Sequence, residues 1–90
     1  MKTEIINYLY TLINKRFKNK NEIIKYLKEE FYNYKISLYY NEDSLPTNDY
    51  SLIGTIENKE FLCDFDIFYA KTRAREMIIT EITHNFELKW

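Results

Sequence analysis

The chain is short of the residues that cross-link a fold or break its regular structure. Its 90 residues include one cysteine, one glycine and one proline. Because Cys63 is alone, no intrachain disulfide can form, and a reducing cytoplasm is the expected compartment. No apolar run approaches the roughly 18 residues of a membrane helix, and the N-terminal segment is polar again by Asn7, unlike a secretory signal. We therefore predict a cytoplasmic domain that does not enter a membrane.

The same scarcities argue against several kinds of enzyme. There is no glycine-rich loop of the type that holds nucleotide phosphates, and no spaced acidic loop of the calcium-binding type. His84 is the only histidine, so a serine triad has no second histidine to use. We predict a non-enzymatic protein with no catalytic residues, no cofactor and no bound metal.

Apolar and aromatic residues, in contrast, are plentiful. The composition is 46% hydrophobic, with nine tyrosines and six phenylalanines. A disordered chain would hold fewer of these residues, and the length suits one domain, so residues 1–90 are predicted to form a single domain. The abundance of Ile, Lys, Asn and Tyr is typical of AT-rich coding sequence. This favours a phage or mobile element of a low-GC bacterium as the source.

Charge is unevenly distributed along the chain although its net value is −1. Residues 1–35 carry eight cations and four anions, whereas residues 36–70 carry one cation and seven anions. Residues 71–90 are close to neutral, with four cations and three anions. This segregation predicts a molecule with surfaces of opposite sign.

The spacing of apolar residues predicts two helices followed by strands. A period of three to four covers residues 3–17 and 21–34, and the period becomes two from Lys35 onward. A loop with the single proline, Pro46, spans residues 41–48. The fold class is therefore α+β, with an N-terminal αα-hairpin packed on one face of a four-stranded, mainly antiparallel sheet (ααββββ). The two layers leave one sheet face open. The expected strands cover residues 35–40, 49–57, 60–69 and 77–88.

The register of the sheet can be predicted from its apolar face. A turn at residues 58–59 and a pairing of Tyr69 with Ile78 keep one face apolar through both hairpins. Shifting either strand by one residue would exchange the faces. The expected core face holds Tyr50, Leu52, Ile56, Phe61, Phe65 and Ile67. The expected open face holds Ile53, Thr55, Leu62, Asp64, Asp66, Phe68, Ile79 and Glu81.

This register also produces two candidate reactive pairs. Asp66 lies opposite Glu81 with Asp64 nearby, and three carboxylates are able to hold Mg²⁺ or Ca²⁺. A simpler interpretation is that a cation of the loop at residues 70–77 neutralises them. Cys63 lies opposite His84, the arrangement that activates a thiolate nucleophile. Since both side chains should face the core, we favour an inert buried thiol.

The open face is the predicted functional surface, because exposed apolar groups beside carboxylates are typical of a protein interface. We expect a protein-binding module, an inhibitor or regulator that occludes its partner. Its carboxylates would stand where phosphates lie in the cationic groove of a nucleic-acid-processing enzyme. The candidate partner-binding residues are Ile53, Leu62, Asp64, Asp66, Phe68, Ile79 and Glu81.

Two alternatives stay open. In the first, the protein is a nucleic-acid-binding regulator that contacts phosphates, or an acidic partner, through the basic helical hairpin and the loop between the last two strands. The residues for that contact are Lys18, Lys20, Lys71, Arg73 and Arg75. In the second, two copies form a homodimer through their open faces or edge strands.

Overall fold

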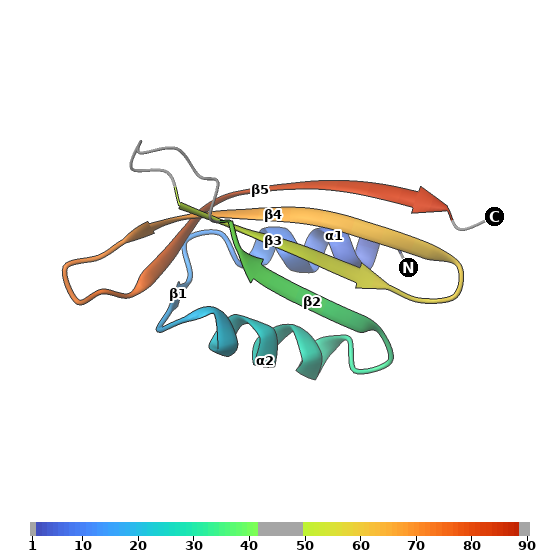
Figure 1. The fold of residues 1–90 in the computed structure, drawn as a ribbon, viewed down its shortest axis with the longest axis horizontal. Coiled ribbons are helices and arrows are strands. Elements are labelled where there is room, and N and C mark those ends of the chain that lie inside the picture. Colours follow the sequence, from blue (N-terminus) through green and yellow to red (C-terminus); the bar gives the residue numbers. More distant parts are fainter. Residues whose placement is uncertain (1, 42–49, 89–90) are drawn as a thin grey trace.

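The fold consists of two N-terminal helices packed on a strongly curled, five-stranded antiparallel sheet that forms a half-barrel (Figure 1). The computed structural model describes residues 2–41 and 50–88. The helices are α1 (Lys2–Thr11) and α2 (Lys20–Glu30). The predicted α+β class and helical pair are therefore confirmed, and the predicted sheet is one strand short.

The missed strand lies between the helices, and the first helix ends before it; the second helix begins nearly as predicted but ends at Glu30 instead of residue 34. It is β1 (Arg16–Phe17), which pairs with the last strand of the chain. Asn14, with φ of 72°, turns the chain into β1 through a left-handed conformation that asparagine tolerates. Asn19 then caps α2, its Oδ1 accepting the Glu22 N–H at 3.0 Å. A helix over residues 3–17 is thus wrong, because the chain becomes extended before Phe17.

The four predicted strands are present at nearly the predicted positions. They are β2 (Lys35–Tyr40), β3 (Tyr50–Glu57), β4 (Phe61–Lys71) and β5 (Met77–Leu88), and the order in the sheet is β1-β5-β4-β3-β2. All described strand pairs are antiparallel. The predicted loop lies largely outside the described residues, since only Asn41 of its eight positions is described.

The register of the β3–β4 hairpin differs from the prediction by two residues. Ile56 lies opposite Cys63 rather than Phe61. The reason is a longer turn, in which the Asn58 N–H donates to the Phe61 carbonyl and Asn58 Oδ1 accepts from the Glu60 and Phe61 N–H groups. Because side chains alternate with a period of two, this shift preserves both faces, and the predicted core side of β4 is confirmed.

A β-bulge changes the faces near the start of β5. Phe68 lies opposite Glu81, but Tyr69 lies opposite Ile79, which leaves Thr80 as the extra residue. The placement of Ile79 on the open face is therefore wrong. Its side chain is fully buried in the core, and Ile78 occupies the open side in its place.

At Gly54, core side chains pack closely against the backbone of the sheet. It lies opposite Phe65, whose ring lies over the glycine together with the Leu38 side chain. No side chain fits in that space, which explains the single glycine of the chain. The absence of a side chain at Gly54 therefore lets the Phe65 ring approach the backbone of β3.

Candidate functional site

Four carboxylates of β4 and β5 gather on the sheet face opposite the helices, and Glu57 of β3, opposite Leu62, lies on the same face. Asp64 and Asp66 are central on β4, and Glu81 and Glu87 lie toward the two ends of β5, opposite Phe68 and Leu62. These alternate positions point away from the buried side of each strand. We call this surface the acidic face; its residues are Asp64, Asp66, Glu81 and Glu87 with the apolar Ile53, Leu62 and Phe68.

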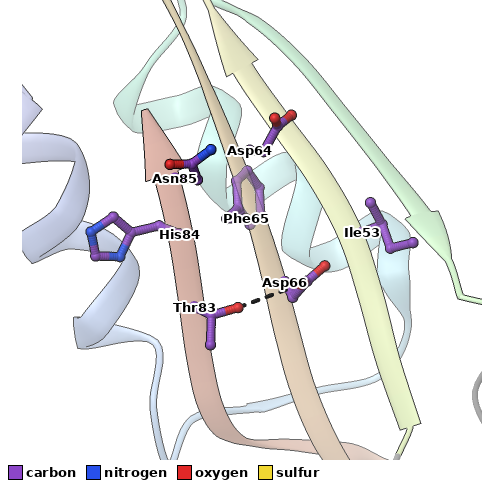
Figure 2. A pocket seen from close by; sticks show the side chains of 7 residues that line it. All are labelled: Ile53, Asp64, Phe65, Asp66, Thr83, His84 and Asn85. Carbon is purple, nitrogen blue, oxygen red and sulfur yellow. Dashed lines mark hydrogen bonds between the residues drawn. The ribbon is translucent and has the colours of Figure 1, made fainter. Parts of the chain in front are cut away.

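The carboxylates of the acidic face are spaced apart by neutral neighbours. Asp66 lies opposite Thr83, whose hydroxyl is 3.4 Å from Asp66 Oδ2, and Asp64 lies opposite Asn85 (Figure 2). The predicted pairing of Asp66 with Glu81 is therefore wrong, because the β4–β5 register is shifted by two residues. Like charges directly opposite each other are unfavourable, and this register avoids them.

Cations are scarce on this part of the sheet. In the described residues of β3, β4 and β5, the only lysine or arginine is Lys71, which lies on the other face of β4. Glu57, on β3, contacts Lys35 of β2, their charged atoms being 3.9 Å apart. The negative charge of Asp64 and Asp66 is therefore not balanced by a described ion pair.

A shallow hollow of about 190 Å³ lies within the acidic face. Its rim includes Asp64, Asp66, Thr83 and Asn85, with Ile53 forming an apolar side (Figure 2). The Ile53 side chain is 44% exposed. A partner side chain that enters here would meet two carboxylates and one aliphatic surface, which suits a lysine or arginine with its long apolar stem.

Of the other residues predicted for the open face, some lie on it and one is buried in the core. Leu62 and Phe68 are partly buried on the acidic face, and Glu81 is exposed there. Ile79 does not belong to the surface, as described above. In the part of the chain that the structure describes, no three side chains of metal-ligating type come together.

Cys63 and His84 do not form the pair that the predicted register suggested. Cys63 lies opposite Phe86, and His84 lies opposite Phe65. The Cys63 thiol is buried, and burial, with a smaller effect of Asp64, raises its pKa from 9.0 to about 11. The thiol therefore stays protonated at neutral pH, which is the opposite of nucleophile activation.

The imidazole of His84 belongs to the helix side of the sheet. Figure 2 shows its ring directed away from the two aspartates, and His84 Nδ1 is 3.3 Å from the Tyr10 hydroxyl of α1. The ring also meets Phe86 edge-on, with 5.9 Å between centroids. His84 thus acts as a packing contact between α1 and β5.

A second candidate surface lies on the helix-covered side of the sheet, next to the hairpin that joins β4 to β5. Three cations and two tyrosines surround a hollow of about 240 Å³ there: Lys18, Lys71, Arg75, Tyr40 and Tyr69. We call it the basic hollow. Lys18 precedes α2, whereas Lys71 and Arg75 belong to the β4–β5 hairpin, which projects beyond the helices (Figure 1). No described residue lining it carries a carboxylate.

Aromatic contacts fix the position of Tyr69, which lines the basic hollow. Tyr50 and Tyr69 stack with 5.5 Å between ring centroids, and Lys71 Nζ lies 4.8 Å from the Tyr50 centroid. Burial raises the pKa of Tyr69, and the neighbouring Tyr40 and Tyr50 raise it further. The Tyr69 phenol is therefore neutral at physiological pH and adds no negative charge to the hollow.

Two of the five predicted phosphate contacts have other surroundings. Lys20 Nζ donates to the Leu38 carbonyl at 3.2 Å and lies 5.6 Å from the Tyr40 ring centroid. Arg73 is exposed in the hairpin turn and does not line the hollow. The prediction named the cations but not Tyr40 and Tyr69. The tertiary structure brings these two tyrosines next to the cations, and no local sequence signal distinguishes them from the other tyrosines.

A third hollow, of about 460 Å³, lies between α1 and the C-terminal end of α2. Tyr8, Glu30 and Phe31 are among its lining residues. Burial raises the pKa of Tyr8 to about 12, with further contributions from Tyr26, Glu30 and Glu29. The protonated phenol donates to the Tyr26 carbonyl at 3.1 Å, so this group ties α1 to α2.

Comparison with known proteins adds no relative from which a role could be transferred. No family model matches the chain, and neither a curated protein nor a solved structure matches it. Among the described residues, no helix is long and apolar enough to cross a membrane.

Proposed function

We propose that the protein is a non-enzymatic binding module whose acidic face occupies a cationic surface of a partner protein and blocks it. The supporting observation is the group of four carboxylates, beside exposed Ile53, on a sheet face that no described helix covers. The partner that this surface fits is a protein with a nucleic-acid-binding groove, since such grooves present lysine and arginine to phosphates.

The arrangement of charge favours that occupant. Residues two apart on an antiparallel strand lie about 7 Å apart, so Asp64 and Asp66 present a regular pair of negative charges. Glu81 and Glu87 extend the negative potential toward both ends of β5. Complementary potentials of this kind raise association rates and select partners by charge.

The same charges make a homodimer through this face unfavourable. A symmetric pair would bring the four carboxylates of one copy against the four of the other, and Lys35 of β2, the one described lysine or arginine of strands β2–β5 on this side of the sheet, is already paired with Glu57. Like charges that face each other across an interface cost several kcal/mol of binding free energy. The proposal therefore includes a protomer that does not pair through its acidic face at neutral pH.

The test uses the heparin-binding protein fraction of the source cell, digested with nuclease and passed over the immobilised protein. The variant Asp64→Asn with Asp66→Asn removes two charges with little change in shape. The matched control, Glu29→Gln with Glu60→Gln, removes two exposed charges elsewhere. We expect the asparagine pair to lower capture at least about tenfold, which is 1.4 kcal/mol, and the control to leave it unchanged.

Three results would overturn the proposal. The first is equal capture by the wild type and the asparagine pair, which would place binding elsewhere. The second is a captured protein that free heparin does not displace, because its groove would then not be the contact. The third is the absence of any captured protein.

A further inference from the structure

We propose that the basic hollow is a binding site for single-stranded nucleic acid, with phosphates held by Lys18, Lys71 and Arg75 and a base stacked on Tyr40. This site lies on the helix-covered side of the sheet, apart from the acidic face. It does not rest on the proposed function, because it concerns direct contact with a nucleic acid instead of a protein.

The cations carry the first part of the argument. Lys18 reaches the hollow from the segment before α2, whereas Lys71 and Arg75 come from the far hairpin, so the fold itself brings them together. No ion pair joins any of them to a described carboxylate. The net charge of the whole chain is −1, yet the described residues that line the hollow include three cations and no carboxylate. Phosphate groups are the natural ligands of such a site.

The tyrosines carry the second part. Tyr40 is 49% exposed with Lys20 Nζ 5.6 Å from its ring centroid, so part of the ring is open to a ligand, while Tyr69 is buried and stacked on Tyr50. Tyr69 therefore gives the hollow an aromatic lining that its stacking on Tyr50 holds in place. Combined cations and aromatic rings distinguish a nucleic-acid strand from a simple anion, since every base has a flat face that stacks on tyrosine.

Size and access indicate a single strand. The volume of about 240 Å³ is smaller than the roughly 300–1,000 Å³ of pockets that enclose a small molecule. A polymer that passes over the hollow and seats one nucleotide at a time fits better than an enclosed cofactor. In a duplex the bases are stacked on one another, so their faces are unavailable to Tyr40.

Binding is measured with a fluorescein-labelled oligothymidylate of about twelve nucleotides, within the site sizes of single-strand binders. Fluorescence anisotropy gives the dissociation constant at several salt concentrations. With three phosphate contacts, the slope of log K against log salt is about −2, so affinity falls about 20-fold between 50 and 200 mM NaCl.

Two variants test the two parts of the site. Lys71→Gln with Arg75→Gln leaves one phosphate contact and should reduce the slope to about −0.7. Tyr40→Ala should weaken binding at least about fivefold, and Tyr40→Phe should restore it because the ring is what stacks. The matched controls are Lys25→Gln with Lys28→Gln on exposed positions of α2, and Tyr32→Ala, whose side chain is 80% exposed. Circular dichroism confirms that each variant folds.

The proposal is overturned by an absence of binding at 50 mM NaCl. It is equally overturned if inorganic polyphosphate or duplex DNA of equal length binds as tightly as the single strand, because the site would then read charge alone or the double helix. Controls that weaken binding as much as the target variants would place the contact elsewhere on the molecule.

Discussion

Replacing Gly54 with alanine tests how tightly the sheet packs against its own core. The new Cβ would overlap the edge of the Phe65 ring and lie 2.9 Å from Leu38 Cδ1. Both neighbours are buried, so neither side chain can turn into solvent. Overpacking of this kind costs about 1–3 kcal/mol, offset by roughly 0.4–1 kcal/mol from the stiffer unfolded chain. We expect the free energy of unfolding to fall by about 1–2 kcal/mol, a Tm decrease of about 4–16 °C for this size.

The assay is urea unfolding followed by circular dichroism, in a double-mutant cycle. Phe65→Leu removes the ring edge that the new methyl group meets, so the double variant should be more stable than the sum of the single effects by about 1 kcal/mol. Phe65→Leu alone supplies the control for the loss of the ring. A Gly54→Ala protein within about 0.5 kcal/mol of the wild type, or additive effects, would refute the close approach of Phe65.

Two further predictions concern the core of the sheet and its buried thiol. Ile79→Ala should lower the free energy of unfolding, measured in urea, by about 2–5 kcal/mol, and Ile78→Ala should lower it by less than half as much. The reason is that the bulge at Thr80 buries Ile79 and leaves Ile78 partly exposed. Equal losses of stability would contradict the bulge. Since the pKa of Cys63 is raised from 9.0 to about 11, the folded chain holds the thiol proton more tightly than the unfolded chain. This stabilisation is complete below pH 9 and is lost as the pH rises toward 11, so the urea midpoint should fall across that window, and less steeply in Cys63→Ala. Identical pH profiles would contradict the buried thiol.

The strands and their faces were predictable because alternation repeats over many residues. A run such as residues 61–69 places five apolar side chains on one face, and only one strand assignment satisfies it. The register was less accurate because a two-residue shift preserves that pattern. The hydrogen bonds of Asn58 within the turn, which the alternation does not report, decide between the two registers.

Three features could not be predicted from the spacing of apolar residues. β1 is two residues long, too short for any period, and Phe17 continues the helical spacing of α1. The bulge at Thr80 exchanges two adjacent isoleucines, which are equivalent in hydropathy. The basic hollow depends on long-range pairing of β1 with β5, which carries Lys18 toward the β4–β5 hairpin. Local sequence therefore identified the cations, and only tertiary structure joined them.

The two proposed surfaces can be separated by exchanging their variants. Asp66 and Lys71 are five residues apart on β4, which is about 17 Å along the strand, and their side chains lie on opposite faces. This separation exceeds the screening length of about 10 Å at 0.1 M salt. We therefore expect Lys71→Gln with Arg75→Gln to leave capture of the protein partner unchanged. Asp64→Asn with Asp66→Asn should in turn alter oligothymidylate affinity by less than about threefold at that salt. A larger change would mean that the acidic face and the basic hollow act as one electrostatic site, and a single ligand contacting both would then replace two independent ones.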